Sequence, residues 1–335
     1  MLVLGQSFSC YNAEAISILY EFKSNQYMPL SLYQFPFQAM GSTCNIQLYA
    51  NNKLNAQNIA DLVVSDVRRI EQKYSRYRND SVLTAINNIA ESAGSIQIDE
   101  ETLALLKYAD TCYQQSGGLF DITSGVLREV WDFKTGEIPK NKEIKKILPK
   151  IGWNKLSIRD TSLSFSVKGM QLDFGGIGKE YAVDRAATIC KQHGFQHGLI
   201  DLGGDIKVIG PHADGRPWSV GIRHPRKPGE LMSSINVSRG AVASSGDYEK
   251  CIILNGKRYS HVLNPKTGWP VRGLSSITVI AEQCVIAGSI TTISMLKETK
   301  GKRWLKGLGL SYLWMDQQGK VGSSLNKHGY IQTTA

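Results

Sequence analysis

Alternating apolar and polar residues predict several half-buried strands along this chain. The segment CNIQLYA at 44–50 alternates in this way, and so does 274–281. Shorter apolar runs predict a strand that ends near Asp173, another at 198–202 and a late strand at 310–315. Strands are therefore expected in the first, middle and last thirds of the chain.

Longer stretches have the spacing of amphipathic helices. A helix is predicted over 57–74, where six apolar residues share one face: Ile59, Leu62, Val63, Val67, Ile70 and Tyr74. Further helices are predicted over 101–114 and, after a glycine-rich turn, over about 179–193. Residues 285–296, VIAGSITTISML, are typical of a mostly buried helix. Residues 132–150 are polar and lysine-rich, which indicates a surface loop with a short helix.

A repeated Asp-x-Gly-Gly turn marks the middle of the chain. It occurs as LDFGG at 172–176 and as IDLGGD at 200–205, each time where a strand is predicted to end. If the two strands run parallel, both turns lie at the same sheet edge, where ligands bind in open α/β sheets. Glycines let backbone N–H groups approach a phosphate, and aspartates can accept hydrogen bonds from a ribose or a flavin ring. Two such turns favour a ligand site over a plain strand-to-helix turn.

The first of these turns, LDFGGIGKEYAVDRA at 172–186, matches neither of two familiar phosphate-binding loops. A Walker A loop needs a glycine where the chain has Asp173, and a Ser or Thr where it has Glu180. The dinucleotide fingerprint needs a third glycine at the position of Tyr181. The loop therefore belongs to neither class.

Composition indicates a globular protein with surplus positive charge. Of 335 residues 42% are hydrophobic, and Lys plus Arg outnumber Asp plus Glu by 39 to 29, a formal net charge of +10. This charge favours anionic partners. It does not indicate nucleic acid, because the nearest approach to a basic run, RHPRKP at 223–228, lacks aromatic residues and is predicted to be a solvated loop. No apolar run reaches the length of a membrane-spanning helix.

Cysteine spacing and the N-terminus bear on the cellular compartment. The six cysteines form no C-x-x-C motif, and three in apolar patterns are expected to be reduced core residues: Cys44, Cys190 and Cys284. Residues 1–30 lack clear periodicity, and residues 1–35 are predicted to be a poorly ordered extension, with Met28 as a candidate alternative start. The N-terminus lacks the basic region of a secretory signal, which favours a cytoplasmic location over a periplasmic one.

Seven motifs, taken in order, resemble the ApbE family of FAD:protein FMN transferases. They are FQAMGSTCNI (37–46), YSRYRNDSVLTAIN (74–87), GGLFDITSG (117–125), LDFGGIGKEYAVDRA (172–186), IDLGGDI (200–206), SGDY (245–248) and SHVLNPKTGWPV (260–271). Each motif alone is weak, but their order makes the set specific. The resemblance covers about residues 36–300.

The resemblance implies a fold and a reaction. The implied fold is α+β and related to the T-fold, a single domain over 36–335 with FAD between two lobes. The implied reaction cleaves FAD with Mg²⁺, attaches FMN through a phosphoester to a Thr or Ser of a target flavoprotein, and releases AMP. The glycine-rich loop would then bind the pyrophosphate of FAD. The family suggests that the target is a subunit of a membrane electron-transfer complex.

The same resemblance assigns roles to individual residues. His261 is implied to accept the proton of the target hydroxyl, although a lone histidine is more often structural. The residues implied to contact FAD are Met40, Tyr77, Leu119, Phe120, Asp121, Asp173, Lys179, Asp205 and Val262. Lys179 would offset pyrophosphate charge beside a helix N-terminus. The implied metal site includes Thr292 and a backbone carbonyl near Gly176.

At the metal site the chain departs from the family pattern. The late helix of the family usually reads A-D-A-x-x-T, and its Asp and Thr bind Mg²⁺. Residues 287–292 read AGSITT, which keeps Thr292 but puts Gly288 where the Asp belongs. Because Mg²⁺ prefers carboxylate and phosphate oxygens, this loss predicts a weaker site. Glu180, which stands where glycine is usual, and Asp205 are the candidates to replace the missing charge.

Three functions follow from this departure. The first is an active FMN transferase whose metal is held by FAD phosphates, Thr292 and a relocated acid. The second is an FAD-binding protein without transferase activity, which stores FAD or regulates a partner. The third is an FAD pyrophosphatase that uses water and yields FMN and AMP. The other motifs are largely intact, which favours the first.

Overall fold

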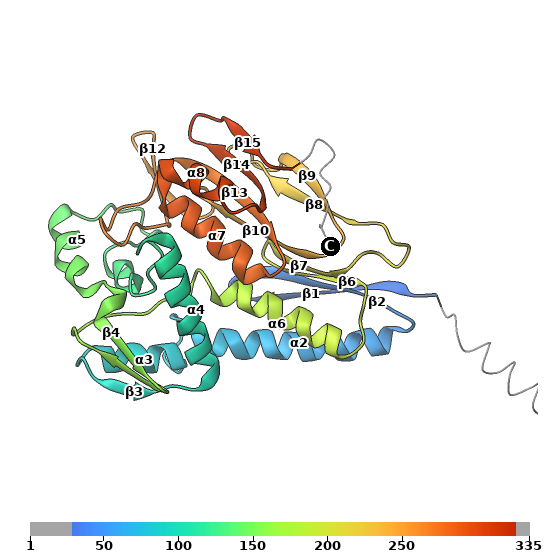
Figure 1. The fold of residues 1–335 in the computed structure, drawn as a ribbon, viewed down its shortest axis with the longest axis horizontal. Coiled ribbons are helices and arrows are strands. Elements are labelled where there is room, and N and C mark those ends of the chain that lie inside the picture. The colour runs from blue at the N-terminus through green and yellow to red at the C-terminus, as the bar shows by residue number, and fades with distance from the viewer. Residues whose placement is uncertain (1–28, 326–335) are drawn as a thin grey trace, which may run out of the picture.

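The computed structural model describes residues 29–325, which form a mixed α+β fold as predicted (Figure 1). Most of the predicted N-terminal extension, including Met28, lies outside these residues. Strand β1 (Ser31–Ala39) begins inside the predicted extension and pairs along its whole length with β2 (Ser42–Ala50). Regular structure therefore starts before residue 36.

An eight-stranded sheet lies at the centre of the described fold, in the order β1-β2-β6-β7-β10-β13-β14-β15. Its later strands are β6 (Gly198–Leu202), β7 (Asp205–Gly210), β10 (Gly240–Gly246), β13 (Leu274–Ala281), β14 (Ser311–Asp316) and β15 (Val321–Ser323). Every neighbouring pair in it is antiparallel. The strands predicted at 44–50, 198–202, 274–281 and 310–315 are confirmed within a few residues.

The interpretation of the two Asp-x-Gly-Gly turns as ends of parallel strands is wrong. Residues 170–173 form no strand, and only Gln171 makes an isolated bridge, with Ser124. The second turn is a tight antiparallel hairpin between β6 and β7. Gly203 and Gly204 have φ angles of +63° and +92° there, which glycine adopts without steric cost. A short apolar run does not distinguish a strand from a buried extended segment.

Both faces of the large sheet are covered. Helices α2 (Lys53–Tyr74), α6 (Gly178–Gln192) and α7 (Cys284–Leu296) pack against one face, over β1–β2, β6–β7 and β10–β13 respectively (Figure 1). The hairpin of β8 (Trp218–Arg223) and β9 (Leu231–Val237) packs against the other face, where Trp218 and Val220 share a core with Leu199 and Val208.

Smaller elements surround this sandwich. Near one end of α2, helices α3 (Val82–Ala90) and α4 (Glu100–Ser116) lie beside a three-stranded sheet of β3 (Ser95–Gln97), β5 (Ser162–Phe165) and β4 (Leu156–Arg159) (Figure 1). The predicted surface loop carries α5 (Asn141–Ile147), whose Ile144 packs near Trp131 in a separate small core. The remaining elements are η1 (Gly125–Glu129), η2 (Leu148–Lys150), η3 (Trp153–Lys155), β11 (Cys251–Leu254), β12 (Lys257–Ser260), η4 (Glu298–Lys300) and α8 (Gly301–Lys306).

The predicted helices are confirmed, with one error on α2. Five of its six predicted core residues are buried, but Leu62 is 49% exposed. The buried residues of α2 centre on the face of Ala56, Val63, Val67 and Tyr74, and Leu62 points about 100° away from Val63, which puts it outside that face. Three cysteines expected in the core are buried and free: Cys44, Cys190 and Cys284. No helix within residues 29–325 is long and apolar enough to cross a membrane.

We expect two substitutions on α2 to differ sharply. Ile70→Ala removes a side chain with 0% exposure and should lower the free energy of unfolding by about 2–5 kcal/mol. Leu62→Ala, at the exposed position, should change it by no more than about 0.5 kcal/mol. Urea unfolding of both variants measures the two values. Equal losses would contradict the described orientation of α2.

Candidate active site

One pocket brings together ten of the twelve site residues predicted from the sequence. Its walls come from the loop after α4, the first turn of α6, the start of β7, the end of β10, the segment after β12 and the middle of α7. The predicted residues in these walls are Leu119, Phe120, Asp121, Asp173, Gly176, Lys179, Asp205, His261, Val262 and Thr292. Segments up to about 170 positions apart in sequence thus meet in one place.

Met40 and Tyr77 do not line this pocket. Tyr77 is 80% exposed, with its ring beside the Arg76 guanidinium. Met40 has a φ of +52°, and its N–H donates to Glu71 Oε1 at 2.7 Å. Next to Tyr77, the side chain of Arg76 reaches the pocket wall. Its Nη1 lies 2.8 Å from Oδ2 of Asp173, which lines the pocket. Contact of Met40 and Tyr77 with FAD stays a prediction.

The first turn of α6 presents an anion-binding end to the pocket. The turn follows Gly175 and Gly176, and no side chain caps the helix. Leading N–H groups of a helix lack intrahelical partners, and the helix dipole favours negative charge there. Lys179 Nζ lies 2.8 Å from Asp205 Oδ2. Burial alone would lower the pKa of Lys179, but the Asp205 carboxylate outweighs it and keeps that pKa above its usual range, so the ammonium stays charged.

The carboxylates of Asp121 and Asp173 are engaged within the protein. Asp121 Oδ1 accepts from the Thr123 N–H and hydroxyl, and its Oδ2 accepts from the Trp153 N–H. Asp173 Oδ1 accepts from the Gly175 N–H at 2.8 Å, which fixes the glycine turn. These two aspartates shape the wall of the pocket by holding its backbone.

The two ring nitrogens of His261 have different surroundings: Nδ1 faces the Lys250 carbonyl, and Nε2 faces away from it. Its Nδ1 lies 3.3 Å from the carbonyl oxygen of Lys250, and a carbonyl can only accept, so Nδ1 is the protonated nitrogen. Burial and, after it, the nearby Arg128 charge lower the pKa of His261 to about 4. The imidazole is therefore neutral near pH 7, and Nε2 can accept a proton.

Glu180 follows Lys179 on α6 and faces Gly288 of α7. Its side chain lines the pocket although the residue is only 7% exposed, and its Oε2 has no hydrogen-bond partner among the described residues. A Cβ added at Gly288 would lie 2.5 Å from Glu180 Cγ and 2.7 Å from its Oε1. Burial, followed by the Asp205 charge, raises the pKa of the Glu180 carboxyl. The structure thus puts a carboxylate where the side chain of an aspartate at position 288 would begin.

The pocket residues fit a divalent cation that is shared with a phosphate ligand. Within residues 29–325 no three His, Cys, Asp or Glu side chains cluster as a metal site. A Cβ at Gly176 would lie 3.9 Å from Thr292 Cγ2, so the Gly176 backbone and Thr292 are neighbours. With the unpartnered Glu180 oxygen, they supply the hard oxygen donors that Mg²⁺ prefers.

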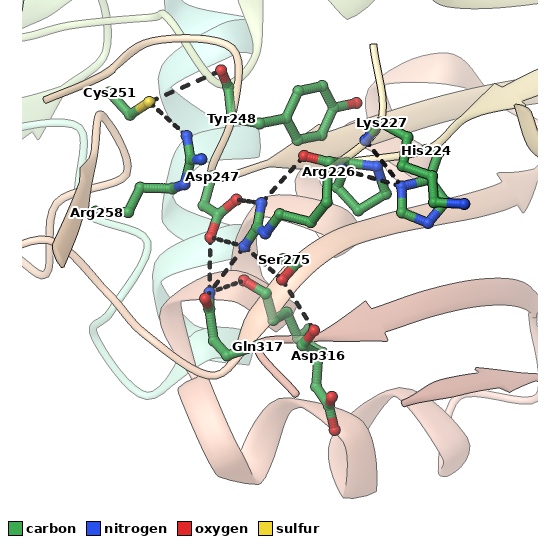
Figure 2. A network of polar contacts seen from close by, with 12 residues as sticks. His224, Arg226, Lys227, Asp247, Tyr248, Cys251, Arg258, Ser275, Asp316 and Gln317 are labelled. Atoms are coloured by element: carbon green, nitrogen blue, oxygen red, sulfur yellow. Dashed lines mark hydrogen bonds and ion pairs between the residues drawn. The ribbon is translucent and has the colours of Figure 1, made fainter. Parts of the chain in front are cut away.

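A buried ion pair fixes the wall that β10 contributes. Arg226 makes a two-pronged pair with Asp247, at 2.6 and 2.8 Å, and also donates to Ser275 Oγ (Figure 2). The Asp247 side chain is 3% exposed, and it directly follows the pocket-lining Gly246. Residues 226–228 are exposed and lie in a turn, as the predicted solvated loop requires, but the Arg226 guanidinium is held by Asp247.

Comparison with known proteins identifies the family. The ApbE family model matches residues 40–314. The chain belongs to the ApbE family. It is 26% identical over 268 residues to the FAD:protein FMN transferase of Haemophilus influenzae, covering 76% of this chain and 78% of the relative. It is 28% identical over 260 residues to the one of Escherichia coli K12, covering 74% of each chain.

Solved ApbE structures share the fold. The ApbE protein of Thermotoga maritima superposes with a TM-score of 0.80 at 31% identity, over 88% of this chain and 97% of that protein. The flavin transferase ApbE of Vibrio cholerae gives a TM-score of 0.79 at 24% identity, over 90% and 99%. The predicted ApbE-like α+β fold is confirmed.

Several pocket residues were missed by sequence reasoning. Arg128 lines the pocket from η1, next to His261, and forms no hydrogen bond or ion pair within residues 29–325. Burial lowers the pKa of its guanidinium, which nevertheless stays charged near pH 7. Ser245, the first residue of the SGDY motif, and Glu249, which directly follows that motif, also line the pocket. Arg128 lies three positions beyond the motif GGLFDITSG, so no motif pointed to it.

We predict that the His261 ring titrates far below an ordinary histidine. Its pKa of about 4 means that the folded state binds fewer protons than the unfolded state between about pH 4 and pH 6.5. Folding stability should therefore fall as the pH drops through this window. Ring proton shifts, assigned by the signal lost in His261→Gln, should give the midpoint near pH 4. A midpoint near 6.5 would contradict the described burial.

Proposed function

We propose that this chain transfers FMN from FAD to a hydroxyl group of a protein and releases AMP. The name of its ApbE relatives, FAD:protein FMN transferase, supports this reaction. The observation that carries the proposal is the pocket itself. There the neutral imidazole of His261 shares one cavity with two cations, Lys179 from the uncapped first turn of α6 and Arg128 from η1.

The reaction breaks one phosphoanhydride bond and forms one phosphoester bond. The acceptor oxygen attacks the phosphorus on the FMN side of FAD, and the bridging oxygen leaves with AMP. The hydroxyl proton moves to His261 Nε2, which faces away from the Lys250 carbonyl and is unprotonated near pH 7. No oxidant or reductant is needed.

Charge and position account for the rest of the proposed catalysis. Lys179 and Arg128 would bind the pyrophosphate oxygens, together with the leading N–H groups of α6. Asp205 orients Lys179 through their ion pair. Leu119, Phe120 and Val262 form an apolar part of the wall, which suits the flavin end of the substrate.

We also propose that the transfer depends on Mg²⁺. Thr292 and the Gly176 carbonyl would hold the ion, together with a carboxylate. A bound Mg²⁺ would neutralise charge on the phosphate oxygens as the phosphoanhydride bond breaks. The acceptor is proposed to be a Thr or Ser of a target flavoprotein. The cytoplasmic location expected from the sequence stays a prediction, which cell fractionation can check.

Incubation with FAD, Mg²⁺ and an acceptor domain tests the proposal. Suitable acceptors are domains that the E. coli relative modifies, with that relative run in parallel as the positive control. We expect AMP release together with an FMN-sized gain in acceptor mass, measured by chromatography and intact-mass spectrometry. AMP without a mass gain would indicate a pyrophosphatase. FAD binding without either product, across the acceptors, would indicate an FAD-binding protein.

We expect His261→Gln to separate chemistry from binding. Loss of the proton acceptor should lower the rate of transfer by about 10²–10⁴-fold, the usual contribution of general base catalysis. FAD affinity, measured by flavin fluorescence, should change by no more than about threefold. His193→Gln, at an exposed position at the C-terminal end of α6, is the matched control and should keep the full rate. A His261→Gln variant with normal transfer would rule out this role of the imidazole.

A further inference from the structure

Glu180 is a buried residue whose carboxyl group has an oxygen without a partner among residues 29–325. The residue is 7% exposed, and Oε2 accepts no hydrogen bond from the described residues. A buried charge normally requires an ion pair, hydrogen bonds or a metal ion, because its desolvation is costly. The nearest cation on α6, Lys179, is already paired with Asp205 at 2.8 Å. The carboxylate of Glu180 is therefore available to a ligand of the pocket.

Gly288 provides the space that this carboxylate occupies. Any side chain at 288 would start 2.5 Å from Glu180 Cγ and 2.9 Å from its Cδ, far inside van der Waals contact. Glu180 and an aspartate at 288 thus cannot coexist in this arrangement. Helices α6 and α7 pack directly together, so the two positions face each other across their interface. Gly288 is a steric requirement of Glu180.

The carboxylate lies on the same face of α7 as Thr292. Residues four apart in a helix are stacked one turn above the other, so Gly288 and Thr292 share a face. Both Glu180 and Thr292 line the pocket, as does Gly176, whose backbone neighbours Thr292. Three oxygen-bearing groups from three segments therefore converge on one part of the cavity.

Asp205, the other candidate to replace the missing charge, is less suitable. Its Oδ2 is engaged by Lys179, and the residue is only 4% exposed. Using it as a metal ligand would require breaking that ion pair and placing an ammonium beside a divalent cation. Glu180 needs no such rearrangement.

We infer that Glu180 is the carboxylate ligand of the metal site, reached from α6 across the space left by Gly288, with Thr292 and the Gly176 carbonyl completing the protein ligands. The inference rests on the proposed Mg²⁺-dependent function. It explains two departures from the family pattern together. In the family pattern the metal-binding carboxylate belongs to the residue at position 288 of α7, whereas here it would belong to Glu180 of α6, and the metal would occupy the same place. The FAD phosphates would supply further oxygen ligands.

Binding of Mn²⁺ in the presence of FAD, followed by the electron paramagnetic resonance signal of free Mn²⁺, tests this role without measuring transfer. Glu180→Gln keeps the size of the side chain but removes the charge. We expect it to weaken Mn²⁺ binding by at least about tenfold. Glu91→Gln, which removes one exposed carboxylate at the end of α3, is the control and should bind like the unmodified protein.

Stability of the protein without metal separates a ligand from a structural residue. Glu180→Gln replaces an unpartnered buried carboxyl group with a neutral amide of similar size, so its melting temperature without metal should be equal to or higher than that of the unmodified protein. The rise in melting temperature on adding Mn²⁺ should be largely lost. If Glu180→Gln lowered the melting temperature and kept the rise with Mn²⁺, the carboxylate would be structural and the inference would be overturned.

Moving the carboxylate back to α7 provides a rescue test. Glu180→Gly should bind Mn²⁺ weakly, and the double variant Glu180→Gly/Gly288→Asp should recover at least about tenfold of the affinity. Gly288→Asp alone should destabilise the protein, because both side chains then compete for one space. Mn²⁺ affinity within about threefold of normal in both Glu180→Gln and Glu180→Gly would refute the inference. Because binding is measured directly, an inactive protein that binds Mn²⁺ through Glu180 would contradict the transferase proposal alone.

Discussion

The unpartnered carboxylate of Glu180 is the constraint on which the described site depends. A carboxylate is costly to bury without a partner, and burial accordingly raises the pKa of Glu180, so this carboxyl group either holds a proton or is bound by a ligand. Packing of α6 against α7 brings the carboxylate over Gly288, where only glycine leaves room. The adjacent Lys179 is committed to Asp205. The first turn of α6 thus presents to one pocket a paired ammonium group, which suits a phosphate, and an unpartnered carboxyl oxygen, which suits a metal ion.

The antiparallel sheet brings these groups together. Its central strands β6, β7, β10 and β13 carry α6 and α7 on one face, so the start of α6, the start of β7 and the end of β10 border the same cavity. The Arg226–Asp247 pair then anchors the chain just after β10 (Figure 2). Glu180 and Thr292 lie on the helices α6 and α7, which limits their freedom more than loops would.

Sequence patterns predicted the elements better than their arrangement. The alternation at 274–281 and the buried character of 285–296 gave β13 and α7 almost to the residue, because period and burial are local signals. The direction of strand pairing is not local, and the parallel interpretation of the two Asp-x-Gly-Gly turns was wrong. Ordered motifs predicted most of the pocket. Arg128 was missed, because its place beside His261 depends on how η1 packs against a segment that is distant in the sequence.

Anomalous diffraction from crystals grown with Mn²⁺ and FAD would test the central claim most directly. The account predicts one Mn²⁺ peak within coordination distance of a Glu180 carboxylate oxygen, with Thr292 and the FAD phosphates as further ligands. A peak held by Asp205 with Lys179 displaced, or an FAD complex in which Glu180 contacts no metal, would contradict it.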